Sequence, residues 1–168
     1  MSKFIPFLLI TLSLPMYGQL KKVYEVDNPT FLDYSSKVFK KHLEYEAKLL
    51  EINSDIISIT KIQLERNEDV SASGLITTNL ASSIDLSSDI NFAMNAFVMS
   101  NGTAMAIKYI LNRIERRVED LKTMKTFINQ SLSFATNSQV VYLGNDARKE
   151  IDRYLRLTEE WLEEAQKL

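Results

Sequence analysis

The chain has 168 residues, of which 45% are hydrophobic, and a formal net charge of -2 at pH 7. This length suits one domain with a packed core, and the slightly acidic balance argues against a nucleic-acid partner, which usually requires a strongly basic face. The chain contains no cysteine. Disulfides, zinc–thiolate sites, a cysteine nucleophile and lipid attachment through cysteine are therefore excluded.

The first 18 residues have the layout of a secretory signal peptide. Lys3 precedes an apolar run from Phe4 to Leu14, and the small residue Gly18 follows that run. The run is too short to span a membrane, which takes about 20 apolar residues. We therefore expect residues 1–18 to be cleaved and the chain to be exported to the periplasm, the cell surface or the medium, with no integral membrane span. An uncleaved anchor helix is the alternative.

The segment that follows, with the letters VYEVDNPTF, changes character at Asn28. Asparagine caps helix N-termini, and proline suits the first helical turn because its missing N–H is not needed there. Asn28 and Pro29 therefore predict a helix start. We expect a short extended segment over residues 19–28 and one helical domain over residues 29–168.

A long amphipathic helix is predicted from Pro29 to about Leu64. Its apolar residues recur every seven positions in three columns. The columns are Phe31, Val38, Tyr45, Ile52 and Ile59; His42, Leu49 and Ile56; and Leu43, Leu50, Ile57 and Leu64. Together they predict an apolar face of about 150°, which is broad enough to contact two neighbouring helices. This breadth indicates a bundle helix rather than a two-stranded coiled coil, whose seam is narrower.

Three further helices are predicted, separated by polar or glycine-containing segments. The helices cover residues 82–99, 103–134 and 146–167, and the connections cover residues 66–74, 100–103 and 135–145, the last with a short ordered piece at residues 140–143. Trp161 falls at the edge of the inward stripe of the last helix. The short connections predict an all-α fold, an antiparallel bundle of about four helices.

Candidate chemistry begins with His42, the only histidine. It falls on an apolar column, so we expect it to be packed, and a lone histidine cannot supply the two Glu-x-x-His motifs of a di-iron bundle site. The carboxylate pairs Asp85 with Asp89 and Glu115 with Glu119 have i, i+4 spacing, which more often marks a solvated face than an acid and base. No catalytic, cofactor-binding or metal-binding residue is predicted, and the chain is not expected to be an enzyme.

The charges are distributed unevenly along the chain. There is no lysine or arginine from Asn67 to Ile107, whereas basic residues are dense from Arg113 to Lys125. Acidic residues alternate with this basic run, so we expect it to form ion pairs along its own helix.

The start of the predicted mature chain resembles the minor-pilin family of type IV secretion and conjugation systems. Members commonly begin with an extended Val-x-Asp-Pro or Val-x-Asp-x-Pro segment that leads into a long helix. The resemblance runs from Val23 to about Leu64, with Val26, Asp27, Pro29 and Phe31 as its core, and residues from Gly74 onward lie outside it. It implies a component at the tip or base of a pilus, which binds other subunits or a target surface and has no active site.

We therefore expect an exported, non-enzymatic helical interaction protein of a bacterial cell envelope. Its expected partners are other envelope or secretion-apparatus proteins, or further copies of itself. The predicted partner-binding residues are Val23, Val26, Phe31 and Trp161. Two alternatives stay open: a periplasmic helical chaperone or adaptor, which the small-residue segment 71–106 would suit, and a secreted membrane-active effector.

Overall fold

The structure, a computed structural model, describes residues 29–168, without the side chains of residues 29, 30 and 83–87. The described chain is helical, as predicted, with five helices rather than four. They are α2 (Pro29–Glu65), α3 (Ser71–Ala81), α4 (Ser83–Met99), α5 (Ala104–Ser133) and α6 (Ser138–Ala165).

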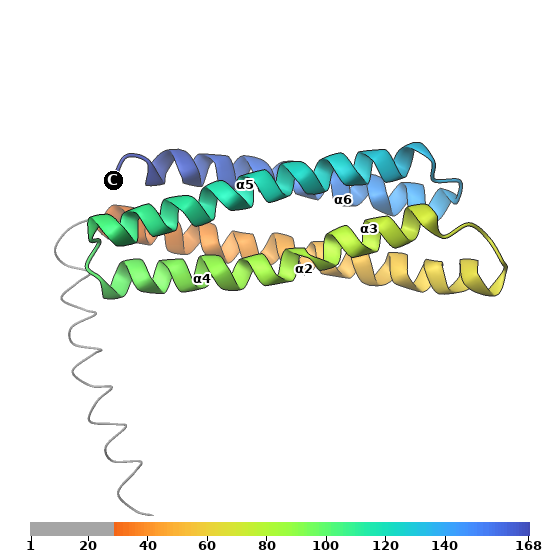
Figure 1. Ribbon diagram of the computed structural model, residues 1–168, viewed down its shortest axis with the longest axis horizontal. Helices are drawn as coiled ribbons and strands as arrows, with labels where there is room; N and C mark the ends of the chain where they lie inside the picture. Colours follow the sequence, from red (N-terminus) through yellow and green to blue (C-terminus); the bar gives the residue numbers. More distant parts are fainter. Residues whose placement is uncertain (1–28) are drawn as a thin grey trace, which may run out of the picture.

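The five helices form four antiparallel rods (Figure 1). α3 and α4 follow one another end to end along one side and are separated only by Ser82, so together they make one rod. Around the bundle, α2 packs against α3 and α6, and α5 packs against α3, α4 and α6. The expected antiparallel bundle is therefore present, with its second rod divided in two.

The first connection is shorter than predicted, because α3 begins at Ser71 rather than near residue 82. Asp69 Oδ1 accepts hydrogen bonds from the backbone N–H of Ser71 at 2.8 Å and from its hydroxyl, which holds the start of α3. Gly74 lies inside this helix and does not end a loop. One glycine costs a helix only about 1 kcal/mol, and the fully buried Ile76 and Leu80 outweigh that cost.

The last helix begins at Ser138, so its predicted start near Asp146 is wrong. The side chain of Asn137 caps it by accepting from the N–H groups of Gln139 and Val140. Gly144 lies within this helix, where a Cβ atom would come 2.7 Å from Cδ2 of Leu132 on α5. This glycine lets two helices approach closely, which the sequence alone does not distinguish from a helix break.

The predicted turn at residues 100–103 is confirmed. Asn101 and Gly102 have φ values of 59° and 68°, in the left-handed region that asparagine and glycine tolerate. The N–H of Gly102 donates to the carbonyl oxygen of Phe97 at 3.1 Å, which closes α4 with a left-handed cap.

The apolar core is divided into two clusters along the length of the bundle. The first cluster joins α3 to α2, α5 and α6, and the second cluster joins α4 to the same three helices. Their fully buried members include Ile56, Leu80, Leu121 and Ile151 in the first cluster, and Ile110, Ile114, Trp161 and Ala165 in the second. The break between α3 and α4 therefore matches a division of the core.

The third column of the predicted apolar face on α2 is not buried, contrary to expectation. Residues of the first two columns are buried or half-buried, but Leu43, Ile57 and Leu64 of the third are 46%, 40% and 58% exposed. α2 packs on its neighbours through these two columns and through buried residues outside them, such as Leu32 and Asn53, so the third column is left at the surface. We call Leu43, Leu50, Ile57 and Leu64 the outer column of α2.

Candidate functional site

Four polar side chains from three helices meet between the two apolar clusters. His42 and Glu46 come from α2, Arg117 from α5 and Tyr154 from α6. Arg117 Nη2 donates to Glu46 Oε1, and Arg117 Nε donates to the Tyr154 hydroxyl at 3.1 Å. That hydroxyl lies 2.9 Å from His42 Nε2, and the guanidinium carbon lies 4.9 Å from the centre of the Tyr154 ring. These four residues, the polar cluster, join α2, α5 and α6.

The polar cluster contains one buried ion pair and two neutral groups. Burial, together with the positive charge of Arg117, lowers the pKa of His42 from 6.5 to about 3. Burial raises the pKa of Tyr154, and Arg117 opposes that change only in part. The ion pair is the contact between Arg117 and Glu46.

Solvent barely reaches the polar cluster. The side chains of His42 and Arg117 are 1% exposed and that of Glu46 is 7% exposed. Among the described residues no group of three His, Asp or Glu side chains lies close enough to hold a metal ion. The cluster therefore has the geometry of a buried structural network, and the packing expected of His42 is confirmed.

The sequence contains a signal for this network that the initial interpretation missed. Arg117 falls on the inward stripe of its helix, beside Ile114, Val118 and Leu121. A charge on an apolar stripe needs a buried partner, because an isolated charge in a core is very costly. The sequence did not indicate that Glu46 is that partner.

The basic run from Arg113 to Lys125 pairs along its own helix, as expected, and also with other helices. Arg116 lies 3.9 Å from Asp120 one turn away on α5. Arg113 reaches Asp89 on α4 at 3.0 Å, and Lys125 reaches Asp152 on α6 at 2.5 Å. Lys122 lies 3.6 Å from Glu159 on α6 as well as 3.3 Å from Glu119 on its own helix. The run therefore stabilises contacts between rods, and its charges are largely neutralised.

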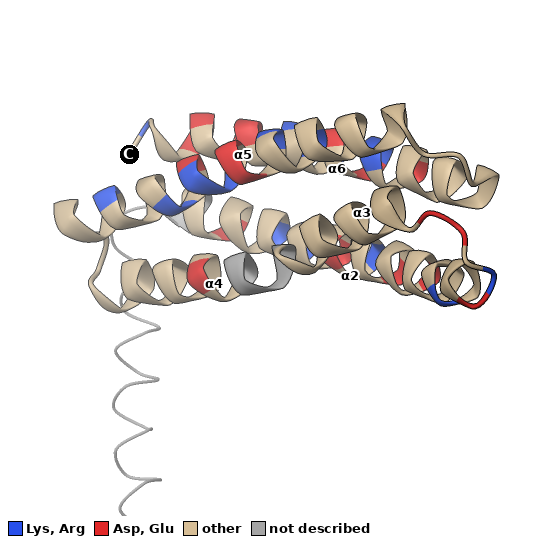
Figure 2. Ribbon diagram, turned by 45° about the vertical axis from the view of Figure 1, so that its right-hand side comes forward, with Lys and Arg blue, Asp and Glu red and all other residues tan. Residues whose placement is uncertain are grey.

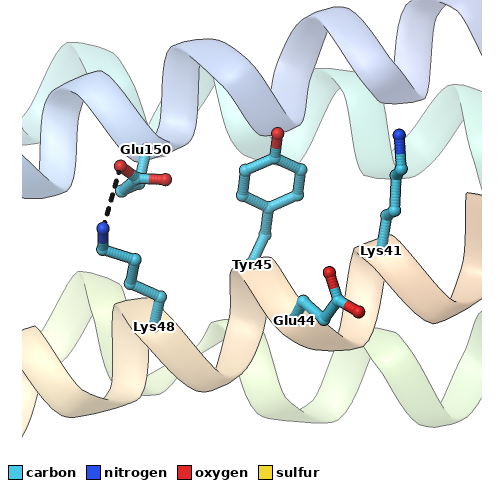
Figure 3. Close-up of a pocket in the computed structure, with 5 residues that line it drawn as sticks. All are labelled: Lys41, Glu44, Tyr45, Lys48 and Glu150. Atoms are coloured by element: carbon cyan, nitrogen blue, oxygen red, sulfur yellow. Dashed lines mark ion pairs between the residues drawn. The ribbon is translucent and has the colours of Figure 1, made fainter.

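A shallow hollow of about 240 Å³ lies between α2 and α6 (Figure 3). Lys41, Glu44, Tyr45 and Lys48 of α2 and Glu150 of α6 line it. Lys48 Nζ lies 3.3 Å from Glu150 Oε1, as Figure 3 shows. The buried Glu150 carboxylate also accepts from Arg153 at 2.7 Å. Its charge is thus already balanced, and the hollow has no feature that selects a ligand.

The side of the bundle formed by α3 and α4 is nearly free of charge (Figure 2). From Val70 to Ile107 the only ionisable residues are Asp85 and Asp89, and Asp89 is paired with Arg113. Large apolar side chains stand in solvent on these two helices: Leu75 (50% exposed), Phe92 (64%) and Met99 (66%). We call these three residues and the surface around them the α3–α4 face.

Exposed positions on both helices of this face are spaced by three and four residues. They are Ser71, Leu75, Thr78 and Ser82 in the first half and Ser88, Phe92, Asn95 and Met99 in the second. Such spacing places side chains on one side of a helix. Each of the two helices therefore has an exposed, uncharged row over the side chains that are described.

The residues predicted to bind partners are not placed together on the surface. Val23, Val26 and the extended segment 19–28 lie outside the described residues. Phe31 is 6% exposed and packs edge-to-face on Phe97, with ring centres 5.6 Å apart. Trp161 is fully buried rather than at an edge, and its Nε1 donates to Ser35 Oγ at 3.0 Å. Both aromatic rings are core residues, because the start of α2 and the end of α6 pack against each other.

Comparison with known proteins shows no matching family model, no similar curated protein and no similar solved structure. Of the helices described, none is both long and apolar enough to cross a bilayer.

Proposed function

We propose that this chain is an exported, non-enzymatic interaction protein of a bacterial cell envelope, an accessory or minor subunit of a type IV secretion or conjugation apparatus. In this proposal the α3–α4 face binds another exported subunit through a surface that is itself apolar and uncharged. The observation that carries the proposal is the exposure of Leu75, Phe92 and Met99 on a face with almost no charge.

Two physical arguments support a protein partner of that chemistry. Large apolar side chains grouped on a surface mark interaction sites, because covering them releases the free energy of hydrophobic burial. A face without Lys or Arg has no attraction for nucleic acid or anionic lipid head groups, which bind through basic residues. The N-terminal resemblance to minor pilins supports the choice of apparatus.

The test is in-cell cross-linking of a C-terminally tagged chain, followed by mass spectrometry of what co-purifies. The natural chain is expected to recover secretion-channel or pilus subunits. Phe92→Glu and Met99→Glu are each expected to reduce this recovery about tenfold or more, since burying either side chain contributes roughly 1.5–3 kcal/mol.

Tyr142→Glu is the matched control, because Tyr142 is 71% exposed but lies on α6. It is expected to leave recovery unchanged. Recovery of no secretion or pilus subunit contradicts the proposed apparatus. Equal recovery with Phe92→Glu and Met99→Glu contradicts the proposed face.

The same face also favours a second function, that of a periplasmic chaperone or adaptor. Methionine is flexible and polarizable, so the exposed Met99 could adapt to varied apolar clients. A chaperone is expected to suppress aggregation of unrelated exported proteins and to lose that activity with Met99→Glu. A pilus subunit should not suppress such aggregation.

A further inference from the structure

The outer column of α2 exposes four large aliphatic side chains at intervals of seven residues. Leu43, Ile57 and Leu64 are 46%, 40% and 58% exposed, and Leu50 is half-buried. α2 is the longest helix, with 37 residues. A column of this kind is half of a coiled-coil seam, which repeats every seven residues.

A second exposed column completes the seam. It consists of Lys40, Ala47, Ser54 and Lys61, each of which is exposed and lies three residues before a member of the outer column. Together the two columns place a seam residue at alternating intervals of three and four positions from residue 40 to residue 64. Large residues therefore alternate with small ones in the middle of the seam, and a lysine stands toward each end.

We propose that α2 pairs in antiparallel orientation with α2 of a second copy of this chain through this seam. In an isologous pair of this kind, residues away from the twofold axis face different residues of the other copy. With the twofold axis near residue 52, Ala47 faces Ile57 of the partner subunit and Ser54 faces Leu50 of the partner subunit. Large side chains then meet small ones, which is the arrangement that fills a helix–helix core.

The charges beside the seam fit the same orientation. In this register Lys61 lies next to Glu44 of the partner subunit, and Lys40 lies next to Glu65 of the partner subunit. Within the described residues none of these four side chains makes an intramolecular ion pair, so their charges are available to a partner. A parallel pair would instead place Lys40 and Lys61 against their own copies, where like charges repel.

The inference does not depend on the proposed function, because it uses a different surface. If the dimer does not form, the α3–α4 face can still bind a subunit. If that face binds nothing, the dimer can still form.

The first experiment measures the mass of the mature chain by analytical ultracentrifugation from about 1 μM to about 1 mM, a range that covers dimers of moderate affinity. The natural chain is expected to dimerise. Leu43→Lys and Ile57→Glu are each expected to weaken the dimer at least tenfold, the first because Leu43 faces Lys61 of the partner subunit in this register. Phe127→Glu is the control, since Phe127 on α5 is 46% exposed, the same value as Leu43, and it should dimerise normally. Circular dichroism of each variant checks that the exposed substitution leaves the fold intact.

A second pair of variants tests the register by its charges. Glu44→Gln removes a partner of Lys61 and should weaken the dimer about twofold to tenfold. Glu51→Gln makes the same chemical change but should strengthen the dimer by a similar factor, because Glu51 approaches its own copy near the axis. Equal effects of the two changes would contradict the register.

A third experiment measures orientation directly, using the absence of cysteine in the chain. Spin labels on Ser36→Cys are expected about 48 Å apart along the antiparallel pair, and labels on Ser54→Cys about 6 Å apart along its axis, from the helical rise of 1.5 Å per residue. Equal short distances at both sites would show a parallel pair and overturn the proposal. A natural chain that stays monomeric, or a dimer insensitive to Leu43→Lys and Ile57→Glu, also overturns the proposal and would mean that the outer column binds a different protein.

Discussion

At the scale of single residues, the polar cluster is the most demanding feature of the core. Arg117 is the largest charged side chain that is fully buried, and its Nη1 has no hydrogen-bond partner among the described atoms. Moving two charges out of water costs several kcal/mol of hydration free energy for each charge. The attraction between them offsets this cost only when their geometry is good. Such a pair adds little net stability, but removing one member is costly.

Arg117→Met is therefore expected to destabilise the protein by about 3–5 kcal/mol, because it leaves Glu46 buried without its cation. Adding Glu46→Leu should recover much of that loss, since the double variant contains neither charge. Urea unfolding of the two single variants and the double variant measures this coupling. Additive losses would show that the two side chains do not act as a pair.

His42 makes stability depend on pH in a defined window. Its pKa is lowered from 6.5 to about 3 in the folded protein, so the unfolded chain binds a proton that the folded chain does not. The contribution of His42 to the free energy of unfolding is therefore complete above pH 6.5 and is lost as the pH falls toward 3. Between pH 6.5 and 5, where most carboxylates stay ionised, the loss is expected to be about 1.5 kcal/mol.

The measurement is urea unfolding of the natural chain and of His42→Gln across that interval. Phe39 and Tyr154 pack on the His42 ring, so the variant will be less stable at every pH. Only its pH dependence is diagnostic. A slope that survives in His42→Gln would assign the effect to another group.

At the scale of helices, two glycines in the same kind of element have different roles. A Cβ atom on Gly74 of α3 would meet nothing within 4 Å, whereas a Cβ on Gly144 of α6 would lie 2.7 Å from Leu132 and 3.3 Å from Ile76. Gly74 can therefore be replaced by a larger residue without a clash, whereas Gly144 allows α6 to lie close to its neighbours.

Gly74→Ala is expected to stabilise the protein by about 0.5–1 kcal/mol, because alanine loses less backbone entropy in a helix. Gly144→Ala should be less stable than Gly74→Ala by at least about 1 kcal/mol, since the helix gain is opposed by the close contact. Thermal unfolding of both variants tests this. Equal gains would mean that Leu132 moves aside without cost.

The elements also show what periodicity can and cannot predict. The apolar period predicted α2, α4 and α5 to within a few residues, and the Asn-Gly turn separates the last two. The start of α6 and the whole of α3 were missed because each contains a glycine. Period and composition do not reveal whether a glycine breaks a helix or permits close packing.

At the scale of the whole molecule, the bundle is two apolar clusters joined by a polar layer. On α2 the change occurs between Val38 and Leu49, where His42 and Glu46 lie. The division between α3 and α4 at Ser82 separates the same two clusters. Each half of the second rod therefore packs on its own cluster, while α2, α5 and α6 run continuously through both. The polar layer requires specific partners, so we expect it to fix the relative register of these three rods.

The sequence by itself determined the helical class, the antiparallel order and the positions of the longest helices, because those depend on local periodicity and on turn residues. Only the tertiary structure decided which apolar residues are covered. It buried Trp161 and Phe31 and left the outer column of α2 and the α3–α4 face in solvent. The physical reason is that an apolar stripe indicates a need for burial but not a partner. Which neighbour meets it depends on how all four rods pack, and that packing joined Arg117 to Glu46 across 71 positions of the chain.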